Sequence, residues 1–223
     1  MAKIEAVLFD LDGTLLDSAL DFHFVINQML AERGKASLSL ENLQHHVSNG
    51  ARAMISYAFN IDNTNAQFEP LKAEFLNKYL QHLNVKSVLY PGVEQVLDFL
   101  QKHCIPWGVV TNKPQLYTEL IMHHQQLHKR AAVVICPDHV RNPKPNPEGL
   151  LLACQKISVA AHNCCYVGDH IRDIEAGSSA GVTTIGCSYG YLNKDEQSAH
   201  WGADFLVEQP LQIINIIRRQ LKQ

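Results

Sequence analysis

The chain has 223 residues, of which 46% are hydrophobic and 18% are charged, and its formal net charge is −3. This length accommodates one large α/β domain or a core domain with an insertion, and either can bury a sizeable apolar core. The mild negative charge and the lack of a dense Lys/Arg run argue against a nucleic-acid binder, and no run reaches the roughly 18 apolar residues of a membrane helix.

The N-terminal tract and the cysteines indicate a cytoplasmic protein. The opening segment MAKIEAVLFDLDG has an apolar run that is broken by Asp10 and Asp12, which is not the pattern of a secretory leader. The six cysteines form no C-x-x-C pair, and most lie in apolar runs, which favours reduced and buried thiols. We therefore expect a cytoplasmic location and a small-molecule partner, with no nucleic acid and no membrane.

The first predicted elements are a strand and a helical insertion. Ile4 to Phe9 is a short apolar run that ends in a turn at Gly13, as expected for a central strand buried on both faces. From about Ala19 to Leu83, apolar residues recur at helical spacing with almost no strand-like alternation. We therefore expect an all-helical cap at residues 16–86 and a catalytic core formed by residues 1–15 and 87–223.

After the turn at Pro91 and Gly92, strands and helices alternate. A helix is predicted through Val96 and Leu100, a strand at residues 107–111, and another helix after Pro114. Further strands are predicted at residues 132–135, 164–167, 183–187 and 205–207. This alternation predicts an α/β fold with a doubly wound, mostly parallel sheet.

Polar side chains follow the ends of the predicted strands, where open parallel sheets bind their ligands. Asp10 and Asp12 follow the first strand, and Gly13 permits a sharp turn directly after them. One aspartate can attack phosphorus while the other handles the proton of the leaving group. The pair also concentrates negative charge for a metal ion, and oxygen ligands favour Mg²⁺ over zinc.

Three later strand ends carry the other candidate residues. Thr111 and Asn112 can hold phosphate oxygens through a hydroxyl and through backbone N–H groups near a helix start. Lys144 lies between two prolines, and Asp169 and Asp173 stand at the start of a predicted helix. Each residue alone has a plain structural explanation as a cap, a turn former or a solvated loop residue. Their joint occurrence in one order favours a functional site.

The tracts DLDGT, TNK, NPKP and GDHIRD together resemble the motifs of the haloacid dehalogenase superfamily, and the resemblance covers essentially the whole chain. It implies a Rossmann-like core, a mobile helical cap and a Mg²⁺-dependent phosphatase that forms an aspartyl phosphate. Asp10 would be the nucleophile, and Asp12 would be the general acid and later the base. Members that cleave carbon–halogen bonds lack this second aspartate, so Asp12 favours phosphoryl transfer.

The resemblance also implies a ligand set. Mg²⁺ would be held by Asp10, by the main-chain carbonyl of Asp12 and by Asp169, with support from Asp173. The phosphoryl oxygens would be bound by Thr111, Asn112 and Lys144. The sequence departs from the common pattern at Asn146 and His170, neither of which is a direct ligand in this scheme.

Within the superfamily, the tracts WGVVTNKP, ICPDHVRNPKPNPEGLLLAC, YGY and HWGAD resemble the phosphoglycolate phosphatase group. CPDHV and HWGAD carry a closer resemblance to bacterial N-acetylmuramic acid 6-phosphate phosphatases. Phosphoglycolate is the alternative substrate, and a sugar phosphomutase or a non-hydrolytic phosphate-binding module are the alternative classes. In the cap, Arg52 follows a Gly-marked turn before a helix. Its planar fork suits the carboxylate that both leading substrates carry, although an ordinary exposed helix arginine explains it equally well.

Overall fold

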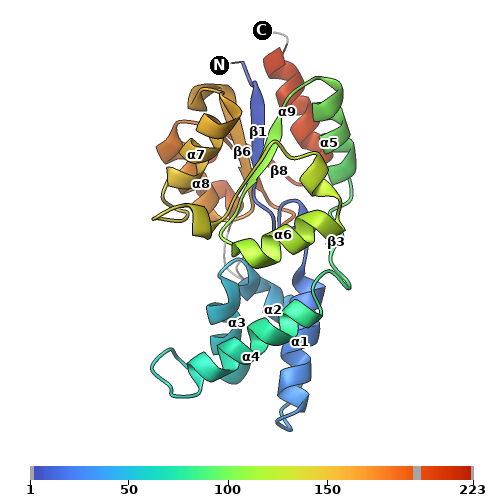
Figure 1. Ribbon diagram of the computed structural model, residues 1–223, viewed down its shortest axis with the longest axis vertical. Helices are drawn as coiled ribbons and strands as arrows, with labels where there is room; N and C mark the ends of the chain where they lie inside the picture. The colour runs from blue at the N-terminus through green and yellow to red at the C-terminus, as the bar shows by residue number, and fades with distance from the viewer. Residues whose placement is uncertain (1–2, 193–196, 222–223) are drawn as a thin grey trace.

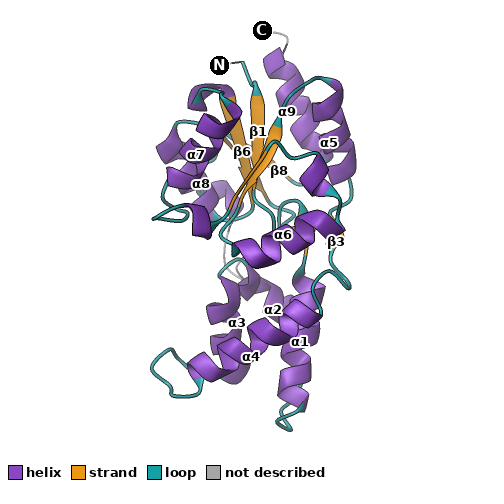
Figure 2. Ribbon diagram, in the orientation of Figure 1, coloured by secondary structure: helices purple, strands orange, loops and turns teal. Residues whose placement is uncertain are grey.

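The computed structural model describes residues 3–192 and 197–221. Its larger part is a six-stranded sheet with helices on both faces (Figure 1). Its smaller part lies beyond one end of the sheet and consists of helices and loops, as Figure 2 shows. The predicted α/β fold with an inserted helical cap is therefore confirmed.

The sheet is parallel throughout and has the strand order β5-β4-β1-β6-β7-β8. Strand β1 lies in the middle, between β4 and β6, as expected for a strand that is apolar on both faces. The strands are β1 (Ala6–Phe9), β4 (Trp107–Val110), β5 (Val133–Ile135), β6 (Cys164–Gly168), β7 (Thr183–Cys187) and β8 (Phe205–Val207).

Helices cover both faces of the sheet because successive side chains of a strand point to opposite sides. Val7 and Phe9 join the apolar cluster that contains residues of α5 (Val93–Lys102), α6 (Gln115–His124) and α9 (Leu211–Leu221). Ala6 and Leu8 join the cluster that contains residues of α7 (Glu148–Ile157) and α8 (Ile171–Ala180). Short 3₁₀ helices lie at Leu127–Lys129, Pro137–His139, Ala161–Asn163 and Ser198–His200.

The cap consists of α1 (Ala19–Ala31), α2 (Leu40–Val47), α3 (Gly50–Phe59) and α4 (Phe68–Gln81). Its helices share an apolar cluster of their own, which includes Phe22, Met29, Ile55 and Phe75. The cap helices supply most of this cluster, and Tyr191 of the core also belongs to it.

Two linkers join the cap to the core. They contain β2 (Leu16–Asp17) and β3 (Val88–Leu89), which pair in an antiparallel two-residue ladder that the sequence did not predict. The buried carboxylate of Asp21 accepts hydrogen bonds from the backbone N–H of Lys86 (2.8 Å) and of Ser87 (3.2 Å). The ladder ties the two linkers together, and Asp21 ties helix α1 to the second linker. We propose to divide cap from core near residues 16 and 86.

All six cysteines are free thiols, and five of them are buried, as expected from their apolar surroundings. Cys104 is exposed. Among the residues that the structure describes, no helix combines the length and the apolar character needed to cross a membrane.

Candidate active site

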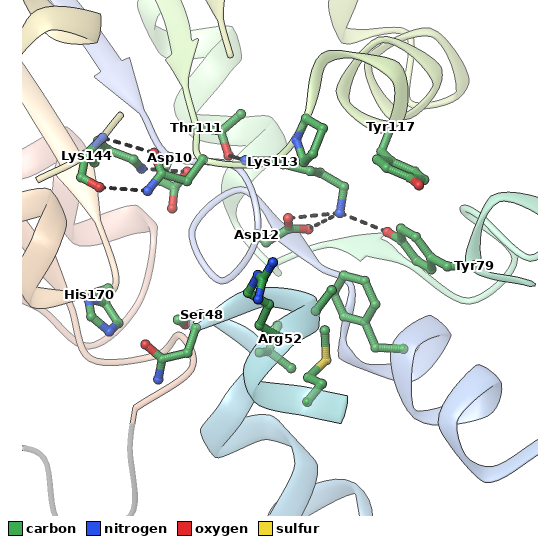
Figure 3. A pocket seen from close by; sticks show the side chains of 18 of the residues that line it. Asp10, Asp12, Ser48, Arg52, Tyr79, Thr111, Lys113, Tyr117, Lys144 and His170 are labelled. Carbon is green, nitrogen blue, oxygen red and sulfur yellow. Dashed lines mark hydrogen bonds and ion pairs between the residues drawn. The ribbon is translucent and has the colours of Figure 1, made fainter. Parts of the chain in front are cut away.

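Asp10 and Lys144 meet at the carboxyl edge of the sheet. Asp10 directly follows β1, and its Oδ1 lies 3.0 Å from the Nζ of Lys144 (Figure 3). Lys144 is only 6% exposed, and its Nζ donates to Asp173 Oδ1 and to the Tyr166 hydroxyl, both at 2.7 Å. The Tyr166 hydroxyl in turn donates to the carbonyl of Val110 at 2.7 Å. The cation is thus fixed beside the carboxylate before any ligand binds.

Asp10 and Lys144 alter each other's pKa. Burial raises the pKa of Asp10, and the nearby Lys144 ammonium opposes that rise. Burial lowers the pKa of Lys144, but the negative charges of Asp10 and Asp173 outweigh this effect, so the net shift is upward. Lys144 is therefore a permanent cation at neutral pH, placed to attract an anionic ligand.

A cluster of three carboxylates lies beside this pair. Single oxygens of Asp10, Asp169 and Asp173 lie within 4.8 Å of one another, and Asp169 and Asp173 are each only 1% exposed. Burial raises the pKa of Asp169 well above its usual value, and the charges of Asp10 and Asp173 add to that rise. A divalent cation would relieve this repulsion, and a donor set made only of oxygen suits a hard metal ion. The cluster therefore fits a metal site.

Asp169 is held in place by neighbours from several segments. Its Oδ1 accepts a hydrogen bond from the Thr14 hydroxyl at 3.0 Å, and its Oδ2 accepts one from the backbone N–H of Tyr191 at 2.9 Å. Gly13 has a φ of +83°, and a Cβ there would lie only 2.1 Å from Asp169 Oδ2. The Gly in the DLDGT tract thus serves a close approach as well as a turn.

The Asp12 carboxylate is engaged differently from the three clustered ones. Its Oδ1 accepts a 2.6 Å hydrogen bond from the Ser18 hydroxyl, and its Oδ2 lies 3.0 Å from the Nζ of Lys113. The side chain lines a pocket that it shares with Asp10. This arrangement leaves the Asp12 carboxylate outside the metal cluster and available for proton transfer.

Thr111 and Asn112 follow β4, as predicted, and both line the same pocket. Thr111 is 5% exposed, and its hydroxyl accepts from the backbone N–H of Lys113 at 3.2 Å. The Asn112 side chain donates to the carbonyl of Lys144 at 2.9 Å and accepts from its N–H at 3.1 Å. The side-chain amide therefore clamps the Lys144 loop, so a phosphate contact from Asn112 would come from its backbone.

The pocket has a volume of about 480 Å³ and lies between core and cap. Its cap wall combines apolar side chains with two cations, Arg52 and Lys72. Arg52 is 59% exposed, and its Nη2 lies 3.0 Å from Glu69 Oε1, while Lys72 contacts the other oxygen of Glu69. Figure 3 shows Arg52 extending from the cap toward the pocket. Two cations thus share one carboxylate, which leaves net positive charge on this wall.

Several site residues were not singled out from the sequence. Lys113 stands inside the TNK tract, so its position was visible, but its contact with Asp12 was not. Tyr166 is an aromatic residue in β6 whose hydroxyl reaches Lys144 from the sheet itself. His170, a departure from the common pattern, accepts from the backbone N–H of Arg172 at 3.1 Å and caps α8.

Residues 7–187 match the family of haloacid dehalogenase-like hydrolases. The chain belongs to this family. It is 42% identical over 219 residues to the N-acetylmuramic acid 6-phosphate phosphatase of Pseudomonas aeruginosa, covering 98% of this chain and 97% of that protein. It is 44% identical over 208 residues to the phosphoglycolate phosphatase of Xanthomonas campestris, covering 93% of this chain and 94% of that protein.

The family's fold also appears in a solved structure. The crystal structure of a predicted phosphoglycolate phosphatase from Haemophilus somnus has a TM-score of 0.86 and 26% identity, and the match covers 97% of this chain and 99% of that one. The relatives named here are phosphatases of small phosphate esters, and this family member is a phosphoric monoester hydrolase. The two sequence relatives are named for different substrates and have similar identity to this chain, so overall sequence identity does not distinguish between those substrates.

Proposed function

We propose that Asp10 attacks the phosphorus of a small phosphate monoester and forms an aspartyl phosphate, which water then hydrolyses. The observation that carries this proposal is the Asp10 carboxylate, 3.0 Å from a buried lysine and beside two further buried carboxylates. Lys144 would offset the repulsion between the phosphate and Asp10. Thr111 and the backbone N–H groups that follow it would hold phosphoryl oxygens.

We propose Mg²⁺ as the metal, held by Asp10, Asp169 and the main-chain carbonyl of Asp12. Bound there, Mg²⁺ would neutralise phosphate charge and orient the ester. Asp173 already accepts from Lys144 (2.7 Å) and from the backbone N–H of His170 (3.0 Å), so it would support the site by fixing its neighbours.

Asp12 would supply the proton in the first step and remove one in the second. As the Asp10–phosphorus bond forms and the ester bond breaks, the leaving oxygen takes the proton from Asp12. Water then attacks the phosphorus of the aspartyl phosphate and gives a proton to Asp12, while the bond between phosphorus and the Asp10 oxygen breaks. Its placement in the pocket, outside the carboxylate cluster, supports this double role.

N-acetylmuramic acid 6-phosphate is the substrate that we propose, as an intermediate of peptidoglycan recycling. Relatives that carry this name from two Pseudomonas species are 42% and 43% identical to the chain and match almost its full length. A pocket of about 480 Å³ with an apolar cap wall suits a substituted sugar better than a two-carbon acid. The 44% identical Xanthomonas relative makes phosphoglycolate the second candidate.

Arg52 is the cap residue that we propose for the substrate carboxylate. It lines the pocket, and both candidate substrates carry a carboxylate. The carboxylate is remote from the phosphate ester in N-acetylmuramic acid 6-phosphate and next to it in phosphoglycolate.

The free thiols of the chain support the cytoplasmic location expected from the sequence.

Release of inorganic phosphate from a panel of esters tests this function. The panel contains N-acetylmuramic acid 6-phosphate, phosphoglycolate, glucose 6-phosphate and pyridoxal phosphate. We expect the highest kcat/KM on N-acetylmuramic acid 6-phosphate. A clear preference for phosphoglycolate would replace the proposed substrate, and no phosphate release from any ester would reject the proposed reaction.

A further inference from the structure

Lys113 is a buried cation at the boundary between core and cap. It lies in the loop between β4 and α6 and is 8% exposed. Its Nζ lies 4.8 Å from the ring centroid of Phe22 in α1 and 4.9 Å from that of Tyr79 in α4. An ammonium group among aromatic rings of the cap is costly to bury unless its charge and its three N–H donors are satisfied.

The Nζ of Lys113 finds its partners on both sides of the boundary (Figure 3). It donates to the two carboxylate oxygens of Asp12 at 3.0 and 3.2 Å, and to the hydroxyl of Tyr79 at 2.9 Å. Asp12 belongs to the core, and Tyr79 belongs to cap helix α4. One side chain therefore contacts the proposed proton donor and the cap at the same time.

The backbone of Lys113 is fixed within the core. Its N–H donates to the Thr111 hydroxyl at 3.2 Å, and its carbonyl accepts from the Thr118 hydroxyl at 3.1 Å. Helix α6 starts two residues later, at Gln115. The backbone that carries the ammonium group is thus fixed. Because a buried ion pair contributes little to stability, a role in holding Asp12 explains the Lys113–Asp12 pair better than a role in folding.

We propose that Lys113 is a positioning residue that holds the Asp12 carboxyl group in the orientation needed for proton transfer to the leaving oxygen. The inference rests on the proposed acid role of Asp12. Ser18, in the linker to α1, holds the same carboxylate at Oδ1 (2.6 Å), so Lys113 and the linker fix it from two directions. Because Tyr79 completes the contacts of Lys113, displacement of the cap weakens this hold on Asp12.

Leaving-group dependence separates this role from a structural one. Lys113→Met keeps an unbranched side chain as far as Cε but removes the ammonium group. We expect it to lower kcat/KM about 100-fold for a sugar phosphate, whose alkoxide needs a proton, and less than about threefold for p-nitrophenyl phosphate. Lys113→Arg, which keeps the charge, should recover part of the loss. Equal losses on both substrates would overturn the proposal.

A double-mutant cycle tests whether Lys113 acts through Asp12. In an Asp12→Asn background, Lys113→Met should change the sugar-phosphate rate by less than about twofold, because the group that it positions is already absent. Losses that multiply would show that Lys113 serves the substrate directly, and the proposal would fall. If Asp12→Asn itself lost activity equally on both esters, the acid role would fail, and the inference with it. If Asp12→Asn lost activity mainly on the sugar phosphate while Lys113→Met lost it equally on both esters, the role of Lys113 would be rejected and the acid role of Asp12 would stand.

A second variant covers the case in which Lys113→Met does not fold, as judged by thermal unfolding. Tyr79→Phe removes only the hydroxyl that accepts from Lys113. We expect a loss about tenfold on the sugar phosphate and near none on p-nitrophenyl phosphate, because Asp12 is less firmly held. A loss of the same size on both esters would contradict the link from the cap to Asp12.

Discussion

Replacement of Arg52 by Ala tests whether the cap recognises the substrate carboxylate. Arg52 lies on the cap wall of the pocket, where its guanidinium pairs with Glu69 at 3.0 Å. Lys72 contacts the same carboxylate, so Glu69 neutralises only one of the two cations. A substrate carboxylate would meet the remaining positive charge, and Arg52→Ala removes that charge because Lys72 and Glu69 then balance each other.

The structure limits the size of this effect. A hydrogen bond to a charged group contributes roughly 1.5–3 kcal/mol. The Arg52 side chain is 59% exposed and is already paired, so solvent screening favours the lower end of that range. A loss of about 1.4 kcal/mol corresponds to about a tenfold lower kcat/KM. We therefore expect Arg52→Ala to lower kcat/KM for N-acetylmuramic acid 6-phosphate by about tenfold.

N-acetylglucosamine 6-phosphate is the matched substrate, because it lacks the lactyl carboxylate, and its hydrolysis should hardly change. Arg33→Ala is the matched control variant. Arg33 is another cap arginine, 34% exposed and paired with Glu74 of α4 at 2.6 Å, but it does not line the pocket. Equal losses on both sugars, or an equal loss in Arg33→Ala, would show that Arg52 serves cap folding or closure and would refute the carboxylate assignment.

Asp10→Asn should fold yet lose essentially all turnover, because an amide is a far poorer nucleophile; substantial hydrolysis by a pure preparation would exclude the assigned role. Gly13→Ala should weaken Mg²⁺ binding, measured by titration, because the new Cβ would lie 2.1 Å from Asp169 Oδ2. The control Gly34→Ala, also at positive φ but with open surroundings, should leave Mg²⁺ binding intact. Burial raises the pKa of Asp169, so the metal-free folded state holds a proton that the unfolded chain releases, and its stability should fall as pH rises above the usual carboxyl range. The rise in Tm caused by Mg²⁺ should consequently grow from about pH 5 to about pH 8, and a pH-independent rise would contradict the carboxylate site.

The strands were largely predictable because each is a short apolar run, and β1, β4 and β6 are buried on both faces. The predicted bounds of β7 and β8 match the structure, while β1 begins at Ala6 rather than Ile4. The ladder of β2 and β3 was missed, since two-residue strands carry no periodic signal and their pairing depends on where the chain returns from the cap.

The convergence of Asp10, Lys144, Asp169 and Asp173 was also predictable, because parallel strands deliver their carboxyl ends to one edge of the sheet. The contact of Lys113 with Tyr79 was not, since it depends on how α4 lies against the core. Side-chain contacts between cap and core depend on packing across sequence separations that local patterns do not encode.

Isolation of the phosphoenzyme tests the central claim most directly. The enzyme is mixed with N-acetylmuramic acid 6-phosphate and Mg²⁺ and quenched in acid within one turnover, and its peptides are analysed by mass spectrometry. We predict one phosphoryl group on the peptide that contains Asp10, and no phosphorylated peptide when Asp10→Asn is treated in the same way. Phosphate on a different residue, or full product formation with no phosphorylated peptide at any time, would contradict the account.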